Sequence, residues 1–290
     1  MLHPSEFVDL ERYPIHRLDS PETQEYIARL KNNFDRTGAC NLEGFITPDG
    51  VNELVRETED LFPYAYSATY TRNYRGEGEA ISKNYCDNLE ENQDLPKDHP
   101  ARVFNTCSKH QIADDQIGPN TLLRQLYVWD ELTQFIAQIQ GKSRLYQFAD
   151  EFQALNVNYL GEGGCSVWHH DESECTVTLL IQEAERGGDF VYCLDTRSIN
   201  GIDDIDKIED AVVRNDRSVV KTLPRKAGTL TLFRGGNSLH SVTAVYGSTL
   251  RITSIMNYDP EPGRISDDRM NRIVYGPRVQ QILDAREKRS

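Results

Sequence analysis

The sequence predicts a mainly β protein with flanking helices, folded as an antiparallel sandwich or jelly roll. From residue 153 onward apolar and polar side chains alternate, which is the period of a strand with one buried face. The strand-like runs are short and separated by glycine and proline, as in antiparallel sandwiches. Before residue 150 the apolar positions recur mostly at helical spacing. Helices should therefore flank the sheets.

The N-terminal half is expected to contain three helices and one short strand. The first helix begins at Ser20-Pro21-Glu22, where the serine caps the helix and the proline fits the first turn, and it ends at Gly38. A strand-like run follows from Ala39 to Ile46. Thr47-Pro48-Asp49 starts a second helix, and the apolar face between Thr121 and Gln140 predicts a third.

The second half contains the expected strands. They cover residues 155–159, 176–181, 190–192, 218–223, 229–233 and 249–258. Ile202 to Val213 is an acidic amphipathic insertion, expected to be a solvated helix, and Pro277 to Ser290 is expected to be a terminal helix. With no repeat and no linker, residues 1–290 should form a single domain. Residues 1–150 would be a helical support and possible lid, 151–260 the jelly-roll core and 261–290 a C-terminal extension.

Residues 62 to about 118 are expected to be irregular, since they are rich in Tyr, Asn and Gly and include an acidic stretch from Asn88 to Asp98. Long loops in compact domains often serve as lids or binding loops, and disorder is the alternative. The part from Tyr64 to Arg75 has four tyrosines together with Arg72 and Arg75. It could be a lid whose arginine holds a substrate carboxylate, or a packed tyrosine-rich loop.

Composition narrows the classes of partner and location. The formal net charge of −14, from 46 acidic and 32 basic residues, argues against nucleic acid or an anionic membrane and fits a small-molecule substrate. We find no signal-peptide pattern and no apolar run of the ~20 residues that span a bilayer, so a cytoplasmic location is expected. The six cysteines show no CxxC spacing and are expected to be free, mostly buried thiols.

A candidate metal site lies in the strand-rich half. In Trp168-His169-His170-Asp171, residues two apart on a strand face the same way, so His169 and Asp171 can share an ion while His170 points away. His240 is the best third ligand, because the other histidines fall outside this region. Two imidazoles and one carboxylate leave three octahedral positions open, as iron(II) needs to bind a bidentate oxoacid and dioxygen. The alternative is a chance HxD with His240 as a hydrogen-bonded core residue.

Motifs around these residues occur in a definite order. Tyr159-Leu160-Gly161 ends a strand in a glycine-rich turn, and Gly187-Gly188-Asp189 makes a tight turn into the next strand. The run from Lys226 to Phe233 is a turn followed by an apolar strand, and Ser238-Leu239-His240 comes next. Arg251 stands in Leu250-Arg251-Ile252-Thr253 on the last strand of the region.

Together these motifs resemble the iron(II)- and 2-oxoglutarate-dependent oxygenases, over roughly residues 153 to 258, and most of all their prolyl-hydroxylase-type branch. The resemblance implies a double-stranded β-helix of the cupin-like jelly-roll type, with Fe(II), 2-oxoglutarate and dioxygen as cofactors. It also implies that a basic residue on the last strand pairs with the far carboxylate of 2-oxoglutarate. Here Arg251 replaces the lysine of that branch, with Thr253 or Tyr159 as expected helpers, and arginine can hold a carboxylate bidentately.

The helical N-terminal half and the end at Asn257-Tyr258-Asp259 are also similar to small oxygenases that hydroxylate or chlorinate free amino acids. Chlorinating members lack the metal-binding carboxylate, so the presence of Asp171 favours hydroxylation. The expected substrate is an amino acid or similar small polar metabolite. A protein- or carrier-bound residue and a non-catalytic cupin-like metal protein remain alternatives. The candidate substrate-binding residues are Asn158, Trp168, Asn257 and Arg72.

Overall fold

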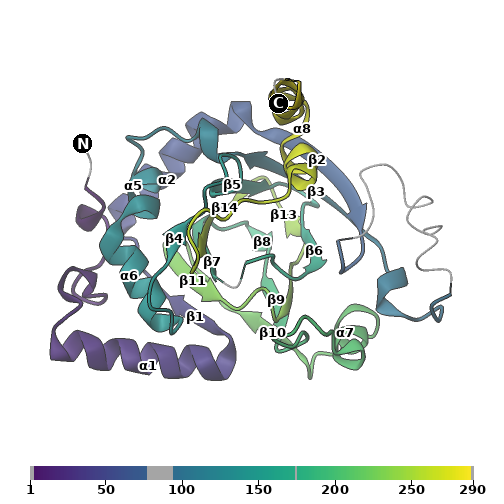
Figure 1. The fold of residues 1–290 in the computed structure, drawn as a ribbon, viewed down its shortest axis with the longest axis horizontal. Coiled ribbons are helices and arrows are strands. Elements are labelled where there is room, and N and C mark those ends of the chain that lie inside the picture. Colours follow the sequence, from purple (N-terminus) through teal and green to yellow (C-terminus); the bar gives the residue numbers. More distant parts are fainter. Residues whose placement is uncertain (1–2, 77–93, 174, 289–290) are drawn as a thin grey trace.

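Two antiparallel sheets face each other in the computed structural model, which describes residues 3–76, 94–173 and 175–288 (Figure 1). The larger sheet has eight strands among these residues. In order across the sheet they are β1 (Ala39–Leu42), β11 (Thr229–Phe233), β7 (Cys175–Gln182), β14 (Arg251–Asp259), β5 (Leu155–Leu160), β3 (Asn105–Ile112) and β2 (Tyr66–Arg72), with β4 (Tyr146–Gln147) paired to β14.

The smaller sheet has four strands in the described part of the chain. In order they are β10 (Val220–Leu223), β9 (Phe190–Cys193), β12 (Leu239–Val242) and β6 (Ser166–His169). A two-stranded ribbon of β8 (Arg186–Gly187) and β13 (Val245–Tyr246) accompanies them. Strands of the chain's second half alternate between the two sheets, which is the jelly-roll arrangement. The predicted fold class is confirmed.

Helices cover the outside of the larger sheet and one end of the smaller one (Figure 1). The α-helices are α1 (Pro21–Thr37), α2 (Pro48–Leu61), α5 (Leu122–Val128), α6 (Asp130–Ile139), α7 (Ile205–Val212) and α8 (Asp268–Glu287). Short 3-10 turns occur at Pro4–Glu6, Ile15–Arg17, Phe62–Tyr64, Pro100–Arg102 and Asp114–Gln116. Helix α1 lies against β1 and α6, α2 packs on β7, α7 contacts β9, and α8 packs on β2.

The predicted starts of the first two helices are confirmed at residue level. The Ser20 hydroxyl accepts a hydrogen bond from the amide of Thr23, and the Thr47 side chain accepts one from the amide of Gly50. Gly38 ends α1 with φ of 68°, a left-handed conformation that glycine adopts without strain. The chain then enters β1 directly, and this strand is shorter than the predicted run.

Three sequence predictions differ from the structure. The segment 62–118 is not irregular throughout, because β2 and β3 lie in it and extend the larger sheet; the acidic stretch 88–98 falls largely outside the described residues. The predicted helix 121–140 is two helices, since the backbone of Trp129 is extended between α5 and α6. The terminal helix begins earlier, at Asp268, and is kinked at Gly276-Pro277.

The N-terminal 150 residues are therefore more than a helical support, because they supply strands β1, β2 and β3 to the larger sheet. The core lies between this sheet and the helices outside it. On β5, Leu155, Val157 and Tyr159 point into that core, while Asn156 and Asn158 point to the opposite face, toward the smaller sheet. The alternation predicted for this strand thus separates the core from the site.

Four described cysteines, Cys40, Cys107, Cys165 and Cys193, are free thiols, and all but Cys165 are buried, as predicted. The predictions for Cys86 and for the side chain of Cys175 fall outside what the structure describes. Among the described helices, none is both long and apolar enough to cross a bilayer.

The kink in α8 gives a first prediction. Gly276 has φ of 67° and ψ of −151°, a region open essentially to glycine alone, and a Cβ there would overlap the ring of Tyr66 on β2. We expect Gly276→Ala to lower the free energy of unfolding by at least about 2 kcal/mol, from strain plus the clash. Urea unfolding followed by circular dichroism measures it.

Gly263→Ala is the matched control, because Gly263 also has positive φ, at 82°, but a Cβ there would meet no atom within 4 Å. Gly263→Ala should lower the free energy of unfolding by only about 1 kcal/mol, because it adds backbone strain but no clash. Equal losses in the two variants would show that the contact between α8 and Tyr66 contributes nothing.

Candidate metal and cosubstrate site

A cavity of about 510 Å³ opens between the two sheets. This volume is typical of small-molecule sites. Strands β2, β3, β5, β14 and β7 of the larger sheet line one side, and β9, β12 and β6 of the smaller sheet line the other. Residues of α8 complete the wall.

The three predicted metal ligands meet in this cavity. His240 of β12 lies directly opposite His169 of β6 in the antiparallel register, with the two ring centroids 4.2 Å apart. The Oδ1 atom of Asp171 is 3.6 Å from Nε2 of His169 and 3.3 Å from Nε2 of His240. One ligand atom from each residue lies within 4.8 Å of the others, a spacing that can hold a metal ion.

The geometry depends on a break in regular strand pairing. His240 pairs with His169 and Val242 pairs with Ser166, so β6 has one residue more than β12 between the two pairs. Such a bulge turns one side chain onto the other face, and Ser166 and His169 accordingly both line the cavity. Asp171 lies beyond the end of β6, where its backbone N–H donates to Gly235 O at 3.0 Å. The three residues come together as predicted, but the bulge, and not simple alternation along β6, brings His169 and Asp171 to the same side.

Backbone carbonyls orient both imidazoles. Nδ1 of His169 is 2.7 Å from Val167 O, and Nδ1 of His240 is 3.1 Å from Ser238 O. A carbonyl only accepts, so each Nδ1 carries the proton and each Nε2 is left with a lone pair. This outer contact is the usual support of a metal-bound histidine. The donor set therefore fits a mononuclear Fe(II) site with three open positions.

The charges of the site agree with metal binding. Burial is the largest cause that lowers the pKa of His169, and the neighbouring His240 and Arg72 lower it further, so the imidazole of His169 is neutral near pH 7. Burial alone would raise the pKa of Asp171, but the two histidines outweigh it and lower the pKa to about 2. Metal binding requires neutral imidazole and ionised carboxylate, and these are the forms of His169 and Asp171 near neutral pH.

Arg251, the predicted cosubstrate anchor, lies on β14 in the wall of the cavity. It is only 5% exposed, lines the cavity, and donates from Nε to Gly188 O at 2.8 Å and from Nη1 to Oγ1 of Thr253 at 2.6 Å. A guanidinium has five N–H donors, so three remain for a carboxylate. Thr253 also lines the cavity. At Gly188 a Cβ would lie 2.6 Å from Cδ of Arg251, so glycine lets the arginine pass.

The prediction for Tyr159 is wrong. Its ring is fully buried on the core face of β5, where its hydroxyl donates to Thr58 O of α2 at 2.7 Å. Asn158, one residue earlier, faces the cavity instead. A hydroxyl held on the far side of the sheet is not available to 2-oxoglutarate.

Three of the four predicted substrate residues line the cavity: Asn158, Asn257 and Arg72. The fourth, Trp168, does not, because the bulge in β6 directs it to a separate apolar cluster with Leu239 and Cys193. Arg72 is on β2, a regular strand, so it does not belong to a lid loop. His170 points away from the metal ligands toward Oγ1 of Thr196, at 2.9 Å.

Sequence reasoning missed several polar groups of the cavity. Lys109 and Gln111 are on β3, inside the segment expected to be irregular, and Arg225 is in the turn before β11. Alternation along β3 could have revealed the first two if that strand had been recognised. The lining contains seven basic residues against three acidic ones, namely Arg72, Arg75, Lys109, Arg197, Arg225, Arg251 and Arg269 against Asp171, Glu172 and Asp267.

Comparison of the sequence with protein-family models and with curated proteins finds no match. Solved structures do match. The 2-oxoglutarate-dependent epimerase SnoN of nogalamycin biosynthesis is 16% identical, with a TM-score of 0.53 over 81% of this chain and 83% of its own. The carbocyclase SnoK of the same biosynthesis is 12% identical, with a TM-score of 0.52 over 86% of this chain and 92% of its own.

HygX from Streptomyces hygroscopicus, solved with nickel, 2-oxoglutarate and hygromycin B, is 12% identical, with a TM-score of 0.52 over 81% of this chain and 88% of its own. At such identities the likeness establishes the fold. The chain thus has the double-stranded β-helix of the non-haem iron, 2-oxoglutarate-dependent oxygenases, and a His-Asp-His cluster stands in its cavity.

The close approach of Asp171 to Gly235 gives a second prediction. A Cβ at Gly235 would overlap the Asp171 carboxylate, so Gly235→Ala should displace this ligand and weaken metal binding about 10- to 100-fold, as other changes next to ligands do. Anaerobic titration with Fe(II), or calorimetric titration with Ni(II), measures the affinity.

Gly118→Ala is the control, because the nearest atom to its Cβ would be 3.7 Å away. This variant should bind metal like the wild type. Unchanged affinity in Gly235→Ala would mean that Asp171 does not depend on this contact.

Proposed function

We propose that the protein is an Fe(II)- and 2-oxoglutarate-dependent oxygenase that hydroxylates an aliphatic C–H of a free amino acid or similar small polar metabolite. The observation that carries the metal and cosubstrate part is the cluster of His169, Asp171 and His240 beside Arg251 in one cavity. When bound, iron and 2-oxoglutarate supply the oxidising chemistry, in which dioxygen converts C–H to C–OH and 2-oxoglutarate to succinate and carbon dioxide.

The protein's own residues bind, orient and exclude water. His169, Asp171 and His240 would hold the iron, and Arg251 with Thr253 would hold the far carboxylate of 2-oxoglutarate. All of these residues except Asp171, which follows the end of β6, come from strands, and strands position side chains more rigidly than loops do. The apolar rings of Phe190 and Phe233 pack against His240 and limit access of water to that ligand.

The polar lining supports a substrate with charges of both signs. Arg72 lies close enough to His169 to influence its pKa, and its Nε is buried without a hydrogen-bond partner. An unpaired buried guanidinium nitrogen is costly until an acceptor reaches it, and a substrate carboxylate fits that need. Glu172 and Asp267 line the same cavity and could pair with an ammonium group. An amino acid carries both groups.

Unpaired amide oxygens support a polar substrate as well. The side-chain oxygens of Asn156, Asn158 and Gln111 are buried without partners, and all three residues line the cavity. Asn158 lies directly opposite Gln111 on one side and Thr253 on the other, which makes a polar row across three strands. Such a row can bind hydroxyl, amide or ammonium groups.

Two comparisons favour a small substrate over a polypeptide. SnoN was solved with iron, 2-oxoglutarate and nogalamycin RO, and HygX with hygromycin B, so proteins of this fold accept small molecules. The cavity volume is in the same range as ordinary small-molecule sites. The presence of Asp171 favours hydroxylation over chlorination, because a carboxylate ligand occupies the position that chloride would take.

The direct test is succinate formation from 2-oxoglutarate by anaerobically iron-loaded protein after admission of air, with each free amino acid added in turn. We expect one amino acid, or a few close relatives, to stimulate turnover. His240→Ala should abolish it through loss of the metal, and Arg251→Ala should weaken it through loss of the cosubstrate anchor. Iron and 2-oxoglutarate binding without stimulation by any amino acid would contradict the proposed substrate class.

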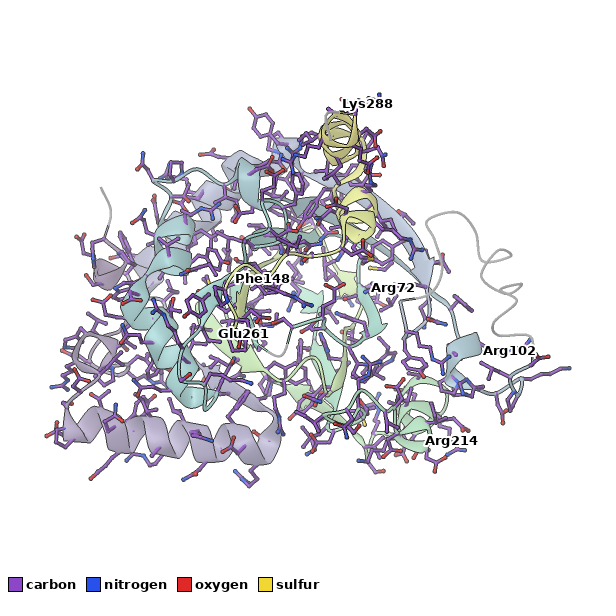
Figure 2. The ribbon with its side chains drawn as sticks, in the orientation of Figure 1. Arg72, Arg102, Phe148, Arg214, Glu261 and Lys288 are labelled. Carbon is purple, nitrogen blue, oxygen red and sulfur yellow. The ribbon has the colours of Figure 1, made fainter. Side chains whose placement is uncertain are left out.

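A separate variant tests the substrate carboxylate. Figure 2 shows Arg72 toward the middle of the molecule, whereas Arg214 lies at the periphery, just after the end of α7. We expect Arg72→Gln to raise KM for the stimulating amino acid about 10- to 100-fold, because a charged hydrogen bond is lost, with little change in the affinity for 2-oxoglutarate. Arg214→Gln, at a residue paired with Glu209 and Asp210 on the surface, should change neither. An unchanged KM in Arg72→Gln would remove Arg72 from the substrate site.

A further inference from the structure

A second arginine stands near Arg251 in the cavity wall. Arg225 lies in the turn between β10 and β11, and both arginines line the same cavity. The guanidinium of Arg225 lies over the ring of Phe190, with Cζ 5.8 Å from the ring centroid. Phe190 begins β9, only two residues after Gly188, whose carbonyl accepts the hydrogen bond from Arg251. The two arginines therefore contact the same short segment: Arg251 binds Gly188, and Arg225 lies over Phe190 at the start of β9.

This end of the cavity is adjacent to the metal site. The ring of Phe190 stacks on the ring of His240, with centroids 5.5 Å apart and planes at 26°. Arg225 therefore lies over the ring of Phe190, and that ring in turn stacks on His240, a candidate metal ligand. An anion bound between the arginines would lie one aromatic ring away from His240.

The two guanidinium groups differ in what they already bind. Arg251 uses Nε and Nη1 for Gly188 and Thr253. In Arg225 both Nε and Nη2 are shut off from solvent and have no hydrogen-bond partner, although the residue as a whole is only part-buried. Burial, followed by repulsion from Arg251, lowers the pKa of Arg225. The acid that acts on Arg251 is Asp189, whose side chain is exposed.

Buried guanidinium nitrogens without an acceptor are unfavourable, and a second positive charge nearby adds to the cost. A carboxylate has two oxygens and about four acceptor sites, so it can accept from two guanidinium groups at once. The missing partner for Arg225 is therefore an anion that enters this end of the cavity.

We propose that Arg225 is a second positioning residue for 2-oxoglutarate, which together with Arg251 binds the C5 carboxylate in a two-arginine clamp. The protein would then require a 2-oxo acid with two carboxylates, because one lacking the far carboxylate would leave both guanidinium groups unpaired. The inference rests on the cosubstrate part of the proposed function and is independent of the substrate class.

The test is calorimetric titration of the Ni(II)-loaded protein, in which nickel replaces iron so that no turnover occurs. The ligands are 2-oxoglutarate and 2-oxovalerate, which keeps the chelating end but lacks the C5 carboxylate. We expect Arg225→Gln to weaken 2-oxoglutarate binding about 10- to 100-fold and to leave the weaker binding of 2-oxovalerate within about twofold. Arg225→Lys should lose less affinity for 2-oxoglutarate, because lysine keeps the positive charge although it lacks the planar, forked N–H donors of arginine.

Lys226→Gln is the matched control, since Lys226 is the next residue and pairs with Glu183 on the surface. It should bind both oxo acids like the wild type. Undiminished 2-oxoglutarate affinity in Arg225→Gln, or an equal loss for both oxo acids, would overturn the clamp. So would a raised KM for the stimulating amino acid with 2-oxoglutarate affinity unchanged, since that result assigns Arg225 to the substrate. Absence of any amino acid stimulation would contradict the substrate class without affecting this titration.

Discussion

The pairing of His240 with His169 across two antiparallel strands is the constraint on which the rest of the site depends. It fixes the distance between the imidazoles through backbone hydrogen bonds, and the bulge in β6 turns His169 into the cavity. The third ligand then needs only a short loop, which Gly235 allows to pass close to the backbone. Because both strands lie in the smaller sheet, the metal site is built on a rigid surface, and the larger sheet is free to supply the groups that bind organic ligands.

The chain as a whole and the lining of its cavity differ in the sign of their charge. The chain carries a net charge of −14, yet the cavity lining has more basic than acidic residues. Acidic residues on the surface favour solubility, while buried arginines such as Arg251 are stable only with acceptors near them. Backbone carbonyl and hydroxyl acceptors meet part of this need at Arg251, and the rest is left for anions that enter the cavity. This basic lining suits anionic ligands.

The sequence was sufficient for the fold class and for selecting His169, Asp171 and His240 as candidate ligands, because most of the signals are short-range patterns. Strand periods, helix caps at Ser20 and Thr47 and the HxD spacing are local signals. The predictions that failed concern features that depend on pairing between segments far apart in the chain. Strands β2 and β3 join the sheet only through partners far along the chain, and the bulge that turns Trp168 away comes from the register between β6 and β12. The sequence also could not show on which side of the sheet Tyr159 lies, because alternation separates the two faces of a strand but does not say which face packs against α2.

The topology also implies that the proposed cosubstrate end and the proposed substrate end of the cavity differ in how freely their residues can vary. Arg251 and Thr253 are on β14, a central strand held by β5 and β7, so few changes there leave the sheet intact. Arg72 is on β2, an edge strand that packs against α8. An edge strand can shift or change sequence with less loss of pairing than a central one. On the proposed function, substrate choice can therefore change at β2 and α8 while the cosubstrate-binding residues of β14 stay the same.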